Sequence, residues 1–482
     1  MEKKPQHAKH VVLLHTNDIH SRLEQAAKIS ARITEARRTH GSDRLLVLDC
    51  GDHMDRMRLE TEGSGGRVNI ELLNEAGYDA VTFGNNEGLT YSKDELFDAY
   101  TAHARFPVVC ANMAESESGE LPEWVLARLI IERGGLRIGL TGATAQYNDF
   151  YRLLGWQVRD PLQSIAAQVG WLRPRVDVVV VLSHLGLPQD ERMAAEVAGI
   201  DLILGGHTHH LLQEPLRAGG TVICATGKFG EYLGRVEIAL RENGEPLITA
   251  ECVPLGAGEM DPEAAAIISR FRESGERRLS RVVTRLQTPL PARTDRESPL
   301  PNLLAAGLRR WTESEIGIVN SGQLLGGLAR GEVTAGQLHA LCPSPINPCR
   351  QRMRGAQLLE ALEQSLLPEF ADKRLQGFGF RGHVLGSLAV DGMTVVYDPQ
   401  RAPGSRIVEA RIADKPLEPE RGYLVGTIDM FTFGAGYPSL KEGSERAYFL
   451  PEFIRDVLSR QLADQDEVER CLQPRWQALA LN

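Results

Sequence analysis

An aspartate and a histidine stand two residues apart directly after a short apolar run near the start of the chain. Residues 11–14 lead into His15-Thr16-Asn17-Asp18-Ile19-His20. Side chains two apart at the end of a strand point to the same side, so Asp18 and His20 can both donate to one divalent cation. A polar loop after a strand is the alternative interpretation of this segment.

Four further polar clusters each follow an apolar run. They are Asp49-Cys50-Gly51-Asp52-His53 after residues 45–48, Gly84-Asn85-Asn86-Glu87 after residues 81–83, Ser183-His184-Leu185-Gly186 after residues 178–182, and Gly205-Gly206-His207-Thr208-His209-His210 after residues 202–204. One such cluster more often marks a turn or a buried histidine than a ligand set, and Cys50 is more typical of a buried strand end than of a ligand. The repetition indicates a metal site. Of thirteen histidines only His339 and His383 lie beyond residue 210, which places that site in the first half of the chain.

Short apolar runs alternate with amphipathic stretches in this half. The pattern predicts strands over residues 11–15, 44–49, 79–83, 106–110, 137–141, 177–183, 201–204 and 221–225, and helices over residues 23–39, 67–76, 162–172 and 188–198. Nearly continuous apolar strands between helices predict an α/β domain with a sheet buried on both faces. Function collects at the carboxyl ends of strands in such domains, so we expect the five clusters to converge on one edge of the sheet.

The alternation of apolar runs and amphipathic stretches ends near residue 255. Leu255-Gly256-Ala257-Gly258 predicts a break, and Asp261-Pro262-Glu263 predicts the start of a charged helix that extends to about Arg285. We therefore predict a first domain over residues 1–255, a linker helix within residues 256–290 and a C-terminal domain over residues 291–482. The last domain is expected to have helices at residues 302–311 and 355–366 and strands at residues 393–397 and 423–427.

The composition is that of an ordinary globular protein. Of 482 residues, 42% are hydrophobic and 24% are charged, which predicts two or three domains. The formal net charge of -10 argues against a nucleic acid polymer as partner, although a small charged substrate can bind through a metal. Residues 1–7 lead into the apolar run 11–14 without an apolar segment long enough for a signal peptide, and no other apolar run is long enough to span a membrane. The seven cysteines include no C-x-x-C pair. We expect a cytoplasmic protein with no membrane partner, and the sequence leaves the oligomeric state open.

The series of clusters resembles the calcineurin-like metallophosphoesterase superfamily. The opening His15-Thr16-Asn17-Asp18-Ile19-His20 is similar to its branch of 5'-nucleotidases, 2',3'-cyclic phosphodiesterases and UDP-sugar hydrolases. The resemblance implies a four-layer α/β/β/α metallophosphatase domain and a smaller α+β C-terminal substrate-binding domain. It also implies a ligand set in which Asp18, His20 and His209 hold one metal, Asn85, His184 and His207 hold the other, and Asp52 bridges them.

These donors suit two divalent metal ions. Carboxylate, amide and imidazole ligands fit Mn, Zn, Fe or Co, and a shared carboxylate holds two ions about 3.5 to 4 Å apart. Such a pair lowers the pKa of a bridging water, so that the metal-bridging hydroxide attacks in line while the phosphoryl oxygens are polarised. No protein nucleophile is needed in such a reaction.

The third cluster departs from the family pattern. Relatives resemble Gly-Asn-His-Glu-Phe-Asp, in which the histidine stabilises the transition state and the aspartate orients it, whereas this chain has Gly84-Asn85-Asn86-Glu87-Gly88-Leu89. Asn86 can donate a hydrogen bond to a phosphoryl oxygen but cannot supply a proton, and a missing acid costs on the order of 10² to 10⁴ in rate. We expect either a substrate with a better leaving group, such as a diester or pyrophosphate, or another acid such as His53 or His15. A purely structural or surface position is the alternative for His53.

The second half resembles the family's substrate-specificity domain more loosely. Asn320-Ser321-Gly322 is similar to its Asn-Ser-Gly-Gly-Ile-Arg motif but continues with Gln323-Leu324-Leu325, so the arginine is missing. Phe433-Gly434-Ala435-Gly436-Tyr437 is similar to Gly-Gly-Asp-Gly-Tyr, with Ala435 where an aspartate would bind a ribose hydroxyl. The resemblance implies that a base stacks between Phe378 or Phe380 and Phe431 or Phe433, with Asn320, Gly322 and Tyr437 nearby. Each phenylalanine taken alone is more typical of a core.

Two functions follow as expectations. The first is a dinuclear metal-dependent phosphoesterase that hydrolyses a nucleotide or a nucleotide-containing phosphoester and takes part in nucleotide catabolism. The second is a catalytically weakened metal- and nucleotide-binding protein. Hydrolysis of a non-nucleotide substrate, including a sulfur ester, is a further alternative.

Overall fold

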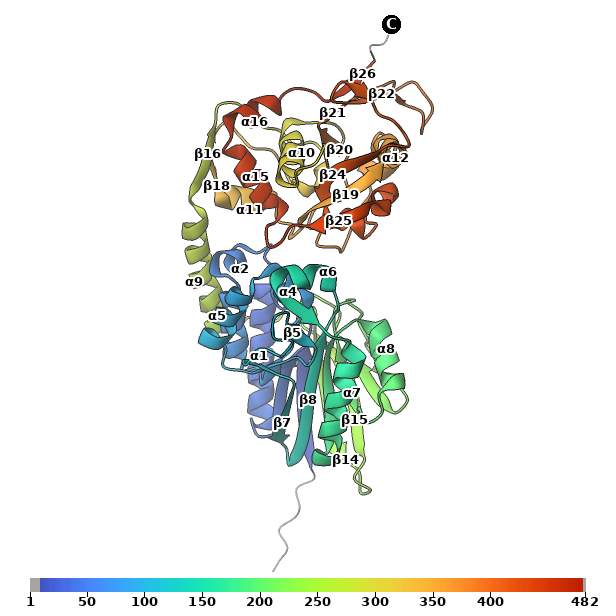
Figure 1. The fold of residues 1–482 in the computed structure, drawn as a ribbon. Helices are drawn as coiled ribbons and strands as arrows, with labels where there is room; N and C mark the ends of the chain where they lie inside the picture. The colour runs from blue at the N-terminus through green and yellow to red at the C-terminus, as the bar shows by residue number, and fades with distance from the viewer. Residues whose placement is uncertain (1–8, 480–482) are drawn as a thin grey trace, which may run out of the picture. The chain divides into compact units, whose positions relative to one another are not determined.

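Two sheets build the first of the two units into which the chain divides, Met1–Gly275 and Glu276–Asn482. The computed structural model describes residues 9–479. Residues 1–7, which bear on the expectation of no signal peptide, lie outside the described residues. In order across the first sheet the strands are β15 (Pro246–Pro254), β14 (Tyr232–Leu240), β1 (His10–Thr16), β2 (Leu45–Asp49), β3 (Ala80–Val81), β4 (Val108–Val109) and β6 (Val125–Leu126). Across the second they are β12 (Leu216–Ala218), β13 (Thr221–Cys224), β11 (Leu202–Gly205), β10 (Val178–His184), β8 (Leu136–Thr144) and β7 (Arg128–Arg133) (Figure 1).

The predicted strands form the parallel parts of both sheets. Parallel pairing joins β1 to β2, β3 and β4 in the first sheet and joins β8, β10, β11 and β13 in the second. Antiparallel strands flank them on one side of the first sheet and on both sides of the second, whereas β6 at the other edge of the first sheet pairs parallel with β4. The long β14–β15 hairpin was not predicted. The expectation of a single sheet edge is therefore wrong, because the five polar clusters start from two sheets.

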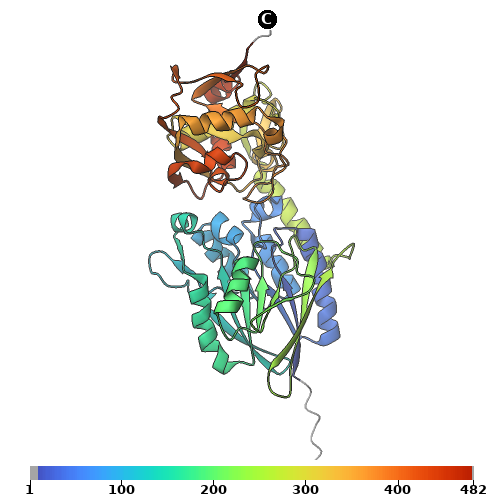
Figure 2. The same ribbon diagram turned by 90° about the vertical axis from the view of Figure 1, so that its right-hand side faces the viewer.

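The two sheets pack face to face with helices outside. Side chains alternate along a strand, so Val180 of β10 lies in the cluster between the sheets with Leu13 of β1, whereas Val179 and Val181 pack against α7 (Pro161–Leu172) and α8 (Leu187–Glu196). On the other side α1 (Leu23–His40) contacts β2 (Figure 2). This arrangement confirms the α/β/β/α layers and explains why the strands are apolar on both faces.

The remaining elements of this unit are short. They are α2 (Leu59–Ser64), α3 (Arg67–Ala76), α4 (Asn85–Thr90), α5 (Lys93–His103), α6 (Asn148–Tyr151), β5 (Met113–Glu115) and β9 (Trp156–Val158). Local sequence sets several helix ends. The Asp160 side chain accepts a hydrogen bond from Gln163 N and Pro161 occupies the first turn of α7, while left-handed Gly77 ends α3.

The charged helix α9 (Pro262–Leu279) ends earlier than predicted. The prediction continued it to about Arg285, but residues Val282–Leu286 form β16, which pairs with β18 (Gly331–Thr334). The β-branched pair Val282-Val283 favours an extended backbone and, with this pairing, explains the error.

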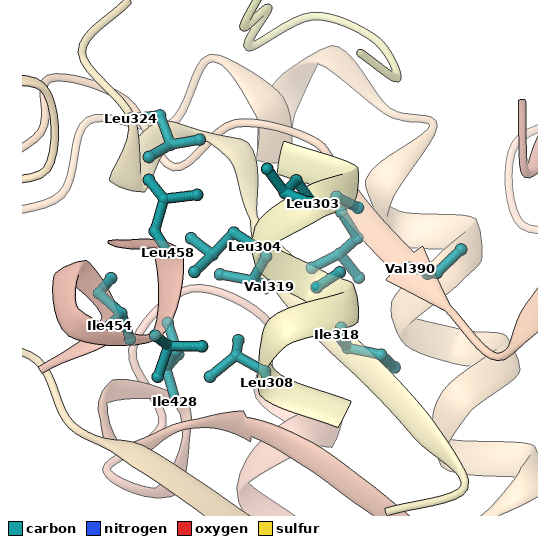
Figure 3. Packing of buried hydrophobic residues seen from close by; sticks show 14 of the residues in the cluster. Leu303, Leu304, Leu308, Ile318, Val319, Leu324, Val390, Ile428, Ile454 and Leu458 are labelled. Atoms are coloured by element: carbon teal, nitrogen blue, oxygen red, sulfur yellow. The ribbon is translucent and has the colours of Figure 1, made fainter. Parts of the chain in front are cut away.

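The second unit is α+β, as expected. Its larger sheet contains β20 (Leu388–Asp391), β17 (Ile316–Asn320), β24 (Gly422–Ile428), β19 (Pro348–Arg354) and β25 (Ser444–Tyr448), and its smaller sheet contains β23 (Lys415–Pro416), β22 (Ile407–Ile412), β21 (Met393–Tyr397) and β26 (Trp476–Ala478). The helices are α10 (Pro299–Trp311), α11 (Ala335–Leu341), α12 (Gly355–Ser365), α13 (Pro368–Ala371), α14 (Asp429–Thr432), α15 (Ile454–Leu462) and α16 (Gln465–Arg470). Figure 3 shows Leu304 and Leu308 of α10 packed among Val319 of β17 and Leu458 of α15.

Within residues 9–479, no helix is both long enough and apolar enough to cross a membrane.

Candidate metal centre

Strand pairing brings the polar clusters together. Thr16 pairs with Asp49 across β1 and β2, and Ser183 pairs with Gly205 across β10 and β11, so in each sheet two clusters begin side by side. The two packed sheets then place all of these strand ends at one site.

Asp18, His20 and His209 form a first group of possible ligands. Asp18 Oδ1 lies 3.7 Å from His20 Nε2 and 3.4 Å from His209 Nε2, and the two imidazole nitrogens are 3.1 Å apart. Asp18 and His20 are buried, while the His209 side chain is 32% exposed. The group therefore has an open side at His209.

Asp18 also belongs to a second group, with Asp52 and His184. His184 Nε2 lies 3.3 Å from Asp52 Oδ1 and 4.0 Å from Asp18 Oδ1. The other oxygen of Asp52, Oδ2, lies 3.8 Å from His20 Nε2. Asp52 thus directs Oδ1 toward His184 of the second group and Oδ2 toward His20 of the first, which is the geometry that a bridging carboxylate requires.

Asn85 and His207, the remaining ligands implied by the resemblance, lie at the edge of these groups. Asn85 begins α4, and its neighbour Asn86 donates its backbone N–H to Asp52 Oδ1 at 2.8 Å. The rings of His207 and His184 are 5.2 Å apart, and His207 N donates to Asp18 Oδ2 at 2.9 Å. His207 Nε2 lies 3.0 Å from the hydroxyl of Tyr147.

The backbone of these loops is strained. Asp18, His20, Asp52, His207 and His209 all have positive φ, between 47° and 74°, which non-glycine residues rarely adopt and which collects at functional sites. Glycine provides the close approach between clusters, since a Cβ at Gly84 would lie 2.0 Å from Asp52 Oδ1.

The buried charges hold one another ionised. Burial opposes ionisation of Asp52, but His184 and His20 outweigh it and keep the pKa of Asp52 well below its usual range. Burial likewise opposes protonation of His184, but Asp52 and Asp18 raise the pKa of His184 to about 10. Carboxylates massed in this way need positive charge among them, which protons or a divalent cation can supply.

Two buried ligand atoms lack a hydrogen-bond partner within residues 9–479. They are Asn85 Oδ1 and His184 Nε2, the latter because its approach to Asp52 lacks hydrogen-bond geometry. Buried polar atoms are rarely left unsatisfied in folded proteins. His184 is held for metal binding because its other nitrogen, Nδ1, contacts the Cys50 carbonyl oxygen at 2.8 Å. The donor set therefore fits divalent metal ions.

The side chain of Asn86, which was predicted to donate to the substrate, contacts the candidate metal ligand His20 instead. Its side chain is 8% exposed, and its Nδ2 lies 3.0 Å from His20 Nδ1 and donates to Met54 O at 3.0 Å. Asp55 Oδ2 also lies 3.7 Å from His20 Nδ1. This geometry makes Asn86 a support for His20.

The two histidines predicted as alternative acids do not face the ligand groups in any contact of the described residues. His53 Nδ1 lies 3.1 Å from Asn69 Nδ2 in a buried polar network, and the His15 ring packs against Gly234 of β14. Burial lowers the pKa of both histidines to about 3. Neutral rings in these positions are poor proton donors near neutral pH.

Two further residues belong to the site, Tyr147, which was not predicted, and Glu87, for which no role was predicted. Tyr147 lies just beyond β8, whose last residue Thr144 pairs with His184, so it could have been found by extending the search for strand-end residues to this strand. The Glu87 carboxylate accepts hydrogen bonds from the backbone N–H groups of Asp52, Met54 and Gly84 at 2.9 to 3.0 Å and fixes the loop that carries Asp52.

In the second unit, the aromatic residues predicted to stack on a base differ in their exposure to solvent. Phe378 and Phe433 are 53% and 38% exposed, and their rings stack with centres 6.3 Å apart and planes at 23°. Phe380, Phe431 and Tyr437 are core residues, with the Tyr437 hydroxyl bonded to Gly386 O, so they present no ring face to a ligand.

Asn320 and Gly322 also have structural contacts. Asn320 Nδ2 donates to Leu385 O at 2.6 Å, and a Cβ at Gly322 would lie 1.9 Å from Val384 O. The motif therefore holds the segment over residues 384–385 against β17.

Matches to known proteins cover both units of the chain. The model for calcineurin-like phosphoesterases matches residues 11–211, and that for the 5'-nucleotidase C-terminal domain matches residues 281–442. The uncharacterized metallophosphoesterase YunD of Bacillus subtilis is 36% identical over 458 residues, which cover 94% of this chain and 98% of that protein. A snake venom 5'-nucleotidase of Gloydius brevicauda is 25% identical over 511 residues, covering 90% of this chain and 83% of that protein. The solved 5'-nucleotidase precursor from Thermus thermophilus shares the fold, with a TM-score of 0.60 at 23% identity over 98% of this chain and 100% of that one. Since YunD matches along nearly its whole length and both family models match in order, the chain belongs to the 5'-nucleotidase family of calcineurin-like metallophosphoesterases.

Proposed function

We propose that this protein is a two-metal phosphoesterase that hydrolyses a nucleotide or a nucleotide-containing phosphoester. The observation that carries the proposal is that each oxygen of Asp52 faces one of two ligand groups that already share Asp18. Divalent cations held there would neutralise phosphoryl charge and activate a water for in-line attack. Similarity to a snake venom 5'-nucleotidase supports a nucleotide as substrate.

The residues around the ligands favour a substrate with a good leaving group. Asn86 replaces the histidine of the family pattern and contacts His20, while His53 and His15 are buried and neutral. No positioned acid is thus found among the residues that the sequence pointed to. Pyrophosphates, and phosphodiesters with an acidic leaving group, depart with less need of protonation and fit such a site better than simple monoesters.

The exposed pair Phe378 and Phe433 supports the proposal that the substrate contains an aromatic base. Their rings are nearly parallel with centres 6.3 Å apart, so a small outward movement makes room for a planar base between them. Replacing either ring by alanine is expected to raise KM for nucleotides while leaving KM for p-nitrophenyl phosphate unchanged. Equal effects on both substrates would contradict a role in base stacking.

A panel of substrates with metal analysis of the same sample tests the proposal. Bis-p-nitrophenyl phosphate, p-nitrophenyl phosphate and a set of nucleotides are offered to the manganese-loaded protein and to its Asp52→Asn variant. We expect metal-dependent turnover that the variant loses.

The alternative is a metal- and nucleotide-binding protein that turns over weakly. Asn86 and Leu89 in place of the family's histidine and aspartate favour this alternative, as does Ala435. Two bound metals with no turnover on any phosphoester in the panel would support it, and hydrolysis of a sulfur ester alone would redefine the substrate.

We also propose a cytoplasmic location. All seven cysteines are free thiols and six of them are buried, which is typical of a reducing compartment. Detection of the protein mainly outside the cytoplasmic fraction of its host would contradict this location.

A further inference from the structure

Two cationic side chains near the candidate metal centre have no acidic partner. Within residues 9–479, neither Arg22 nor Lys228 forms an ion pair or a side-chain hydrogen bond, although both residues are half-buried. Arg58, on a neighbouring segment, shows the contrast, because it pairs with Glu24 at 2.8 Å. Positive charge that no carboxylate balances attracts anionic ligands.

Both cations lie over one aromatic ring that touches a metal ligand. The centre of the Phe229 ring is 4.6 Å from Arg22 Cζ and 4.7 Å from Lys228 Nζ. The same ring packs edge-on against His20, with ring centres 5.8 Å apart. The aromatic contact orients the two cations without neutralising them, so their positive charge remains available beside His20.

The loop that carries Lys228 and Phe229 is fixed to the metal-binding residues. Asn17 Nδ2 donates to Gly227 O at 2.8 Å, and Phe229 N donates to Asp18 O at 2.7 Å. Arg22 stands two residues after His20 and directly precedes α1, without a side-chain hydrogen bond to the start of that helix. Both cations are therefore attached to short segments that the metal ligands themselves hold in place.

We propose that Arg22 and Lys228 form an anion subsite that takes a phosphate of the substrate other than the one being cleaved, as in a nucleoside diphosphate or another pyrophosphate ester. The proposal rests on the phosphoesterase function proposed above. The guanidinium of Arg22 matches the oxygens of a phosphate, and the ammonium of Lys228 adds a second charge. In a pyrophosphate only one bridging oxygen separates the two phosphorus atoms, so a phosphate held by the metal ligands keeps its neighbour close to those ligands, among them His20, which Phe229 contacts.

Binding of inorganic pyrophosphate and inorganic phosphate tests the subsite. Calorimetry is run on the manganese-loaded protein, with metal content measured on the same samples. The double variant Arg22→Gln/Lys228→Gln is expected to bind pyrophosphate at least about tenfold more weakly, while phosphate affinity changes less than about twofold. The charge-conserving variant Arg22→Lys/Lys228→Arg is expected to keep most of the pyrophosphate affinity.

Arg175→Gln is the matched control. Arg175 also lies over an aromatic ring, with Cζ 4.3 Å from the centre of the Trp171 ring, but it precedes β10 at the end opposite His184. This variant is expected to bind both anions as the wild type does. Thermal melting checks that each variant is folded, and Lys228→Gln alone serves if the double variant melts early.

Two results with the double variant would overturn the subsite. Unchanged pyrophosphate affinity in the double variant would do so, and equal losses for both anions would show only a general electrostatic effect. If the wild type turns over esters and binds phosphate while the double variant still binds pyrophosphate normally, the subsite fails and the proposed function stands. If the metal-loaded wild type binds neither anion and turns over no ester, both fail.

Discussion

Asn86 is expected to act through the metal ligand His20 and not on the substrate. Its Nδ2 has two contacts of 3.0 Å, to His20 Nδ1 and to Met54 O, and each buried hydrogen bond contributes about 1 kcal/mol. Asn86→Ala removes both and leaves its backbone N–H on Asp52 intact. The contact to His20 alone corresponds to about 1 kcal/mol, or roughly fivefold weaker metal binding. The contact to Met54 O holds Asn86 in place, so losing both sets an upper limit of about 2 kcal/mol, or roughly 30-fold, within the 10- to 100-fold range typical of groups that orient a ligand. Competition with a fluorescent chelator measures the manganese affinity, and steady-state kinetics at saturating manganese measures kcat.

Asn69→Ala is a matched control for this variant. Asn69 is also a buried asparagine whose Nδ2 contacts a histidine ring, His53 Nδ1 at 3.1 Å, and a backbone carbonyl, His53 O at 2.9 Å. It is expected to lose stability but to keep the manganese affinity of the wild type. The reasoning is refuted if Asn86→Ala binds manganese normally and kcat at saturating metal falls by on the order of 10² or more, because Asn86 would then act on the transition state.

Three further variants test separate parts of the structure. Asp52→Asn removes the carboxylate between the two ligand groups and is expected to lower metal content and turnover together, so a fully loaded inactive variant would contradict a bridging role. Tyr147→Phe removes the hydroxyl 3.0 Å from His207 Nε2 and is expected to lower kcat by up to about tenfold at unchanged metal content, whereas unchanged kinetics would exclude Tyr147 from the site. Burial raises the pKa of Asp429 from 3.8 to about 7, so its stabilising contribution is complete below pH 4 and is lost as the pH rises through 7. In urea unfolding, the wild type is expected to lose about 3 kcal/mol of its free energy of unfolding between pH 5 and pH 8 through this group, and Asp429→Asn is expected not to show this loss. An equal pH dependence of the two proteins would contradict the role of Asp429.

The candidate metal ligands could be predicted because short-range rules place them. Asp18 and His20 are two residues apart, and Asp52 and His184 follow strands whose apolar runs are plain in the sequence. Parallel pairing aligns the ends of such strands, so a list of strand-end residues is already close to a list of ligands.

The division into two sheets and the direction of single side chains could not be predicted. The pattern of Val179, Val180 and Val181 shows burial on both faces, but it does not show whether a helix or a second sheet covers each face. Phe378 and Phe380 are the same residue type and stand two apart, as side chains on one face of a strand would. Phe378 is nevertheless exposed and Phe380 is in the core, because they lie in an irregular loop in which Phe378 has a φ of 54°. Periodicity carries no information about orientation in such a loop.

The departures of this chain from its family are connected through His20. A histidine at position 86 would bring positive charge toward the substrate, whereas Asn86 brings none and contacts Nδ1 of His20. On the edge of the same imidazole lies Phe229, which holds Arg22 and Lys228. If these cations bind a second phosphate, the charge absent from position 86 is supplied from the other side of His20, and it favours substrates that carry more than one phosphate. Restoring a histidine by Asn86→His would then disturb the support of His20 without restoring activity on monoesters, because the chain has no aspartate at Leu89 to orient the new ring.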